Sequence, residues 1–437
     1  MTARPFVDLD EEIERRHGPI PGLFERSGEA EFRRIEGELA TEALCRDEPS
    51  VVALGGGALT SPPTRERLAR RAFTVRLTVD VGEAWRRVQG SDRPLVRTED
   101  SFRRLFDERA PVYEATADAA AAEADGVVLA ALAIEFGRGL FGRLSSLVEP
   151  PLAVVADERV LALHPVSLAG SVHRVPPGEE AKTLALAERL WEELPLDRGG
   201  TIVALGGGAT TDVAGFVAAT HLRGVRWVAV PTTLVGQTDA AIGGKTAINV
   251  GTGKNRVGAF HLPARVVVDP DLVATLPASE RRAGLAEVVK TGLLAGSALW
   301  ELPEEEMIRR SAAFKAAVVL SDPEERGRRA ILNLGHTFAH ALEAASEFRL
   351  SHAHAVALGL LAALRLSGLP TDVVEEVLGP RPVRVDPARA WAALERDKKN
   401  AGGRRRLVLL ERPGKPVFPA EVPDGDVRRE LEALIAT

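Results

Sequence analysis

Residues 201–258 read TIVALGGGATTDVAGFVAATHLRGVRWVAVPTTLVGQTDAAIGGKTAINVGTGKNRVG, and this stretch decides the fold. The apolar run Thr201–Leu205 predicts a buried strand, and Gly206–Gly208 follow it directly. Asp212 then opens an apolar segment with helical spacing. A strand, a glycine turn and a helix start place backbone N–H groups where a phosphate can approach. Glycines in such turns also serve packing alone, so both interpretations stay open for this feature by itself.

Two more glycine clusters follow within the same stretch. A second predicted strand, Trp227–Val230, ends in Pro231–Thr233, and the chain then reaches Gly243–Lys245 and Gly253–Asn255. Three glycine clusters in about sixty residues favour a nucleotide or phosphate site over packing alone.

The rest of the chain divides around this stretch. Residues 127–275 alternate strands with helices, which predicts a Rossmann-like parallel α/β sheet, and one of these strands ends at Asp157. The helix expected in PGEEAKTLALAERLWEEL carries Glu179 and Lys182 in its first turn. Residues 276–437 read as mainly α-helical, residues 119–126 as a linker, and residues 1–118 as a separate α/β unit. The predicted fold class is therefore α/β with a helical C-terminal domain.

Composition excludes several classes of protein. The chain has 437 residues and a net charge of −6, without a basic cluster interleaved with aromatic residues, which argues against a nucleic-acid partner. A single cysteine, Cys45, rules out an internal disulfide framework and a cysteine-rich metal site. No apolar run approaches a membrane span and no signal-peptide pattern opens the sequence, so we expect a cytoplasmic protein without a membrane partner.

Lysine is rare in this chain. Of 56 basic residues only eight are lysines, so a retained lysine suggests a place that needs a compact ammonium group. Chance explains any one of them, but most stand beside Gly, Asp, Glu or His. The lysines are Lys182, Lys245, Lys254, Lys290, Lys315, Lys398, Lys399 and Lys415.

Three segments carry candidate metal ligands. These are Glu287 in GLAEVVK, His336 and His340 in GHTFAH, and His352 and His354 in SHAHAV. Histidines at i and i+4 share a helix face, whereas residues two apart do not, so one of His352 and His354 should face inward. A Glu/His/His set leaves an open coordination position, as a catalytic divalent metal requires. The alternative is that these histidines pack or cap helices.

A glycine-rich nucleotide cradle joined to a metal site indicates oxidation of a hydroxyl group by a nicotinamide cofactor. The metal would polarise the oxygen while the cofactor accepts the hydride. Lysines and arginines around such a cleft imply an anionic, phosphorylated substrate.

Residues 127–437 closely resemble 3-dehydroquinate synthase. The resemblance rests on GGGATTDVAGF, ATHLRG, VPTTLVGQTDAAIGGKTAIN, GKNRVGAF, DLVATLP, AGLAEVVKTG, RRAILNLGHTFAHALE and DKK. It implies a 3-deoxy-arabino-heptulosonate 7-phosphate substrate, NAD, and zinc or cobalt. It further implies oxidation, phosphate elimination, reduction, ring opening and aldol closure. Whether the chain forms a homodimer stays open.

The same resemblance implies site residues by motif. The implied metal ligands are Glu287, His336 and His352. The implied NAD contacts are Asp157, Glu179, Lys182, the turn Gly207–Asp212 with Gly208, Thr232, Thr233, Lys245, Lys254 and Thr275. The implied substrate contacts are Arg223, Asp239, Lys245, Asn255, Lys290, Lys315, Arg329, Asn333, His340 and either Lys398 or Lys399. One departure is His354, which stands where the family usually has glutamate. If that carboxylate orients a ligand, metal affinity or pH dependence could change, and His354 is an alternative ligand.

The N-terminal unit resembles shikimate kinase. The matching residues are Asp8 and Asp10, the pair Phe32-Arg33, the turn Gly55–Gly57 and the segment Arg93–Leu95. In that family the Asp10, Arg33 and glycine-turn positions would hold shikimate. A phosphate loop of this type needs a lysine on the transferred phosphate, and none precedes Lys182. We therefore expect this unit, as given, to lack kinase activity; a structural remnant and a shortened bifunctional protein are equal alternatives.

Three alternative functions are compatible with these features. Another sugar-phosphate cyclase would use the same cofactor and metal, a glycerol-type dehydrogenase would release NADH, and a degenerate scaffold would do no chemistry. Asn333, Lys315 and His340 favour the synthase.

Overall fold

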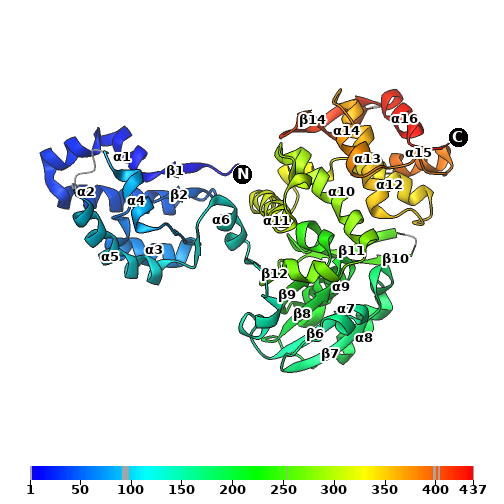
Figure 1. Ribbon diagram of the computed structural model, residues 1–437, viewed down its shortest axis with the longest axis horizontal. Helices are drawn as coiled ribbons and strands as arrows, with labels where there is room; N and C mark the ends of the chain where they lie inside the picture. Colours follow the sequence, from blue (N-terminus) through cyan, green and yellow to red (C-terminus); the bar gives the residue numbers. More distant parts are fainter. Residues whose placement is uncertain (1, 91–97, 252, 397–399, 402–403, 437) are drawn as a thin grey trace. The chain divides into compact units, whose positions relative to one another are not determined.

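The computed structural model describes residues 2–90, 98–251, 253–396, 400–401 and 404–436. The chain forms two compact units, Thr2–Ala131 and Leu132–Thr437 (Figure 1). Each has its own hydrophobic core, and each is described by itself.

The first unit is built from short parallel strand pairs and helices. Strand β1 pairs with β2, and β3 pairs with β4. The Asp8 carboxylate accepts a hydrogen bond from the Asp10 N–H at 2.9 Å and so caps α1. The elements are β1 (Phe6–Asp8), α1 (Leu9–His17), α2 (Ile20–Leu44), β2 (Val51–Ala53), η1 (Ala58–Thr60), α3 (Pro62–Arg71), β3 (Val75–Leu77), α4 (Val81–Val88), α5 (Glu99–Thr116), β4 (Ala119–Ala121) and α6 (Ala124–Ala131).

The linker predicted at residues 119–126 is wrong. Ala119–Ala121 form strand β4, which pairs with Val75–Leu77, and α6 begins at Ala124. Alanine is depleted in strands, so the local sequence does not indicate one here, and pairing with a strand more than forty residues earlier cannot be read from local sequence. The first unit therefore extends to Ala131.

The second unit begins with the predicted parallel sheet, in the order β5-β12-β9-β8-β6-β7 (Figure 1). Every residue of β6 and β8 is buried, as expected for parallel strands covered on both faces. The elements are β5 (Ile134–Phe136), η2 (Phe141–Ser146), β6 (Leu152–Asp157), α7 (Glu158–Leu163), β7 (Gly170–Val175), η3 (Gly178–Ala181), α8 (Leu184–Glu193), β8 (Thr201–Gly206), α9 (Gly208–Thr220), η4 (His221–Arg223), β9 (Arg226–Pro231), the π-helical turn η5 (Gly236–Ala240), β10 (Lys245–Val250), β11 (Gly253–Phe260), β12 (Arg265–Val268) and η6 (Pro270–Thr275).

The strand order locates the cofactor cleft expected of this fold. From β6 the chain moves outward to β7, but from β8 it moves the other way to β9 and β12. The carboxyl ends of β6 and β8 therefore meet at a topological switch point, where open α/β sheets bind ligands. Ala156 and Leu205 are paired neighbours just before these ends.

Two helix starts differ from those predicted. Helix α9 begins at Gly208 rather than at Asp212, because the glycine turn leads directly into helical backbone. Lys182 precedes α8 instead of standing in its first turn, since Thr183 caps the helix by accepting a hydrogen bond from the Leu186 N–H at 3.1 Å.

The remaining part is mainly helical, as predicted, but it also contains a three-stranded antiparallel sheet that was not predicted. The apolar run Leu407–Leu410 in β14 is too short for its pattern to distinguish strand from helix. The elements are α10 (Ala278–Ala295), η7 (Leu299–Glu301), α11 (Glu304–Ser321), η8 (Arg328–Asn333), α12 (His336–Ala345), α13 (His352–Leu366), α14 (Asp372–Val377), α15 (Pro387–Glu395), β13 (Asn400–Ala401), β14 (Arg404–Arg412), β15 (Lys415–Pro423) and α16 (Asp424–Ala433).

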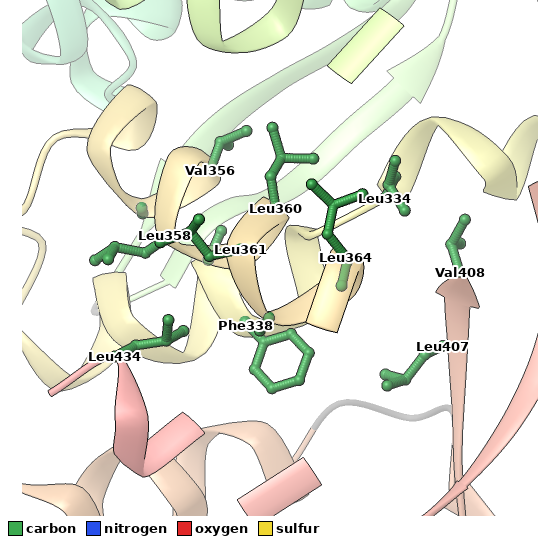
Figure 2. Packing of buried hydrophobic residues seen from close by; sticks show 14 of the residues in the cluster. Leu334, Phe338, Val356, Leu358, Leu360, Leu361, Leu364, Leu407, Val408 and Leu434 are labelled. Carbon is green, nitrogen blue, oxygen red and sulfur yellow. The ribbon is translucent and has the colours of Figure 1, made fainter. Parts of the chain in front are cut away.

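Helix α13 lies at the centre of this helical part. Figure 2 shows its apolar side chains, including Leu360 and Leu364, with Phe338 of α12 and Leu407 of β14 in the surrounding cluster. Among the described residues, no helix combines the length and the apolar composition needed to cross a membrane.

Two glycines bring α12 and α13 into close contact. A Cβ atom on Gly359 would lie 2.1 Å from the carbonyl oxygen of Gly335, which has φ 78° just before α12. The backbones of the two helices can come this close only because neither glycine has a side chain.

We expect Gly359→Ala to destabilise the second unit by about 1–3 kcal/mol, because the new methyl group overpacks this contact. Alanine would otherwise be favoured over glycine inside a helix, so the expected sign opposes helix propensity. Gly425→Ala is the control, since nothing lies within 4 Å of its Cβ position in α16. Denaturant unfolding of the two variants measures the difference; equal stability would contradict the close packing.

Candidate functional site

The carboxyl edge of the sheet carries the predicted cofactor residues. Asp157 ends β6 and accepts the Arg159 N–H at 2.8 Å, while the Thr232 N–H donates to the Gly206 carbonyl oxygen at 2.9 Å. Asp157 and Thr232 are both buried. The two predicted positions thus lie at the carboxyl ends of β6 and β9, the strands that flank β8.

A polar cluster lies beside this edge. Lys182 is buried, and its ammonium group contacts Asp212 at 2.5 Å and also the side-chain oxygen of Asn255. Asn249 links Asn255 to Glu179, accepting the Asn255 N–H at 2.9 Å and donating to the Glu179 carboxylate at 2.9 Å. Asn255, implied as a substrate contact, therefore joins residues implied as NAD contacts.

Burial decides the charge state at this cluster. Burial raises the pKa of Asp212 to about 6, although the Lys182 ammonium acts in the opposite direction. Asp212 is therefore an ionised acceptor above about pH 6 and a neutral donor below it. An ionised Asp212 could accept hydrogen bonds from ribose hydroxyl groups.

The glycines of the turn have a packing reason as well. A Cβ atom on Gly207 would lie 3.0 Å from Thr233, and one on Gly208 would lie 2.9 Å from the Cβ of Ala240. The packing interpretation is therefore correct for these two glycines. It does not exclude a phosphate at the start of α9, whose first N–H groups point out of the helix. The contact between Gly208 and Ala240 also places η5 directly against the turn.

Asp239 of η5 joins this edge to the helical part. Its carboxylate lies 2.7 Å from the Lys315 ammonium of α11 and 3.9 Å from the Lys290 ammonium of α10. Lys290 in turn contacts Glu287, and both are buried. Burial would raise the pKa of Asp239, but these two lysines lower it below its usual value.

Glu287, His336 and His352 converge from α10, α12 and α13. One ligand atom from each lies within 4.8 Å of the other two. In the described structure, neither Glu287 oxygen has a hydrogen-bond partner, although the Lys290 ammonium and both imidazoles lie within ion-pairing distance. A buried carboxylate that faces an ammonium group and two imidazoles fits a divalent metal with an open coordination position.

The charges of this group also suit a cation. Burial would raise the pKa of Glu287, but Lys290 and the imidazoles lower it well below its usual value. Burial lowers the pKa of His336 to about 3, so its imidazole is neutral. Burial also acts to lower the pKa of His352, but the Glu287 and Glu343 carboxylates raise it to about 10.

The other two histidines differ in placement. The His340 ring centroid lies 5.5 Å from that of His336, at the edge of the group. His354 points elsewhere, with Nε2 2.7 Å from the Arg381 carbonyl oxygen. The structure therefore brings His352, and not His354, to Glu287.

A second set of predicted substrate residues surrounds the turn before β10. Lys245 contacts Glu325, which accepts a hydrogen bond from the Asn333 amide at 2.8 Å. Arg329 is buried and donates to the Gly243 carbonyl oxygen at 2.8 Å. Burial lowers the pKa of both Lys245 and Arg329.

Comparison with known proteins finds matches along most of the second unit. Residues 172–283 match the family model described as 3-dehydroquinate synthase N-terminal, and residues 284–400 match 3-dehydroquinate synthase C-terminal. The 3-dehydroquinate synthase of Thermobifida fusca (strain YX) is 38% identical over 346 residues, which cover 68% of this chain and 92% of that protein. That of Salinibacter ruber (strain DSM 13855 / M31) is 41% identical over 284 residues, covering 58% and 77%.

The chain belongs to the 3-dehydroquinate synthase family. This confirms the resemblance seen in the motifs and the prediction of an NAD- and metal-dependent lyase family. Residues 1–133 match the family model for shikimate kinase, which confirms the second resemblance.

A solved structure shares the fold of the second unit. A 2-epi-5-epi-valiolone synthase from Streptomyces hygroscopicus subsp. jinggangensis 5008, with NAD+ and Zn2+ bound, has a TM-score of 0.60 at 25% identity. The match covers 69% of this chain and 94% of that one. A 2-deoxy-scyllo-inosose synthase, at 24% identity and a TM-score of 0.62, covers 69% and 96% and supports the fold alone.

Arg223, Thr275 and the lysine of the DKK motif stay predictions as site residues. Arg223 is exposed in η4, just beyond the C-terminal end of α9. Thr275 contacts His164 at 2.8 Å rather than any residue of the Lys182 cluster. Lys398 and Lys399 lie outside the described residues.

Three residues of the site were not predicted: Glu325, Glu343 and Asn249. Glu343 had a readable signal, since it stands seven residues after His336 and three after His340 on one helix face. Glu325 and Asn249 lie in loops or hairpin strands, where no periodicity reveals a partner. Lys254, implied as an NAD contact, lies 3.5 Å from Glu343.

The shikimate kinase-like unit keeps most of its implied ligand residues together. A Cβ atom on Gly55 would lie 2.7 Å from oxygens of both Asp10 and Glu36, and Gly57 faces the Arg33 guanidinium. Glu36 is buried and lies 2.6 Å from Arg33, and burial raises its pKa. Arg93–Leu95 lie outside the described residues.

The charge states predict proton release on metal binding. A ligand imidazole must be neutral, so a divalent metal should displace one proton from His352 below about pH 10. We expect about one proton per Zn2+ at pH 8, and an apparent affinity that rises about tenfold per pH unit in this range. Calorimetry in buffers of different ionisation enthalpy measures the proton count; a count near zero would contradict the assignment.

Proposed function

We propose that the second unit converts 3-deoxy-arabino-heptulosonate 7-phosphate to 3-dehydroquinate and phosphate, using NAD and zinc or cobalt. The observation that carries the proposal is the convergence of Glu287, His336 and His352 beside the buried lysines Lys290 and Lys315. Family membership supports the reaction, because relatives that share about two thirds of this chain are 3-dehydroquinate synthases.

Glu287, His336 and His352 would hold the metal. When bound, the metal supplies a Lewis acid that polarises a substrate hydroxyl or carbonyl, and NAD supplies the hydride acceptor. The turn at Gly207 and Gly208 would hold the cofactor phosphates at the start of α9.

The chain's own cations would hold the anionic substrate. Lys290 and Lys315 are buried. The Asp239 and Glu287 carboxylates lie beside their ammonium groups and compensate the positive charge. Lys245 is about half exposed and is paired with Glu325, so it can turn toward a phosphate at low cost. His340 would position or relay protons, being the side chain type that changes charge near neutral pH.

The other sugar-phosphate cyclases are the closest functional alternative. The two solved cyclases share 24% and 25% identity with this chain, against 38% for the Thermobifida fusca synthase. Incubation with each sugar phosphate separates these functions. A glycerol-type dehydrogenase would instead accumulate NADH, which a cyclase regenerates as NAD in each turnover.

Removing the metal ligand should abolish phosphate release. We expect Glu287→Ala, or addition of a chelator, to lower phosphate release from the heptulosonate phosphate by about a hundredfold or more. Glu280→Ala on the exposed first turn of the same helix is the matched control and should retain activity. Wild-type activity in an intact Glu287→Ala protein, or net NADH accumulation with turnover, would reject the proposal.

We infer that residues 2–131 by themselves transfer no phosphate. Residues 1–181 contain no lysine, which phosphate loops of this type use on the transferred group. The shikimate kinase match also fits the alternative, a bifunctional shikimate kinase and dehydroquinate synthase.

Incubation of the chain with shikimate and ATP should therefore yield no shikimate phosphate. Phosphate release from the heptulosonate phosphate in the same preparation is the control for an active protein. Clear kinase activity would contradict the inference and favour the bifunctional alternative.

We further propose that the protein acts in the cytoplasm, which its single cysteine, Cys45, supports because disulfides are rare in reducing compartments. A homodimer stays a prediction.

A further inference from the structure

Glu343 lies in the last part of α12 and is almost completely buried. One of its oxygens, Oε1, lies 3.4 Å from Nδ1 of His352 and 3.5 Å from the Lys254 ammonium. A buried carboxylate is costly unless charged or hydrogen-bonding groups compensate it. His352 and Lys254 are therefore the groups that compensate the buried Glu343 carboxylate.

The geometry at His352 distinguishes its two ring nitrogens. Nε2 lies 3.4 Å from Oε1 of Glu287, within the proposed metal site, while Nδ1 faces Oε1 of Glu343. An imidazole that donates its Nδ1–H to a carboxylate has its ring orientation and tautomer fixed, with the Nε2 lone pair directed at the metal.

We propose that Glu343 is the positioning residue for His352, holding Nε2 toward the metal and raising its strength as a ligand. The proposal rests on Glu287, His336 and His352 being the metal ligands. It assigns to Glu343 no contact with substrate or with the reacting atoms.

His354 does not supply this function. Its Nε2 contacts backbone atoms of Arg381, at 2.7 Å from the carbonyl oxygen and 3.2 Å from the N–H.

Lys254 completes the arrangement. It reaches Glu343 from β11, and its ammonium lies 5.1 Å from the ring centroid of Phe348 in the loop that follows α12. A positive charge on this side compensates the buried Glu343 carboxylate, whose Oε1 also faces His352 Nδ1. The β10–β11 hairpin thereby stabilises the same side chain that orients the metal ligand.

The test measures metal affinity in the full chain, without substrate. Apo protein is titrated with Co2+ and with Zn2+ against a competing chelator, and the visible absorption of bound Co2+ is recorded. Glu343→Leu keeps the volume but removes the acceptor, and Glu343→Gln keeps a neutral acceptor. Glu347→Gln is the matched control, because Glu347 is an exposed carboxylate just beyond α12 that pairs with Arg389 at 3.0 Å.

We expect Glu343→Leu to weaken Co2+ and Zn2+ binding by about ten- to a hundredfold. Glu343→Gln should weaken it less, and both should change the Co2+ absorption spectrum. Glu347→Gln should match wild type in affinity and spectrum. Thermal unfolding and circular dichroism of each apo variant separate this effect from a loss of fold.

Wild-type metal affinity and Co2+ spectrum in a folded Glu343→Leu protein would overturn the proposal. If Glu343→Leu does not fold, the same result in Glu343→Gln overturns it. Because no substrate is present, failure of the proposed synthase reaction would leave this measurement unchanged, so the two proposals can fail separately.

Discussion

A chain of alternating charges, three of them buried, links the sheet edge to the helical part of the second unit. Glu287, Lys290, Asp239 and Lys315 come from α10, η5 and α11, and each contacts the next. Each charge costs several kcal/mol to bury and is stabilised by its neighbours, so removal of one leaves another uncompensated. The sheet and the helical part are therefore linked by the same residues that would meet an anionic substrate.

The two cores give this chain of charges a rigid setting. The parallel sheet places β6 and β8 side by side at the switch point, which makes the carboxyl edge the natural position for a cofactor. In the helical part, α12 and α13 approach closely at Gly335 and Gly359, and this contact helps fix the separation of His336 and His352. Site geometry thus depends on backbone packing as well as on the ligands.

The glycine turn illustrates how one motif can have two causes. Gly207 and Gly208 lie against Thr233 and Ala240, so packing alone would retain them. The same contact bears on function, because Ala240 is the neighbour in sequence of Asp239, whose carboxylate pairs with Lys315. The rare lysines were the more specific signal, because Lys182, Lys290 and Lys315 are all buried and all paired with carboxylates.

The sequence by itself determined the parallel sheet, the helical C-terminal part, the family, and Glu287, His336 and His352 as candidates, because these depend on periodicity and on residue types at fixed spacings. Only the tertiary structure decided between His352 and His354 and extended the first unit through β4. It also revealed Glu343 and Glu325, which act through contacts made by residues far apart in sequence. The physical reason is that periodicity reports which face of an element is buried, whereas a site is defined by which buried faces meet.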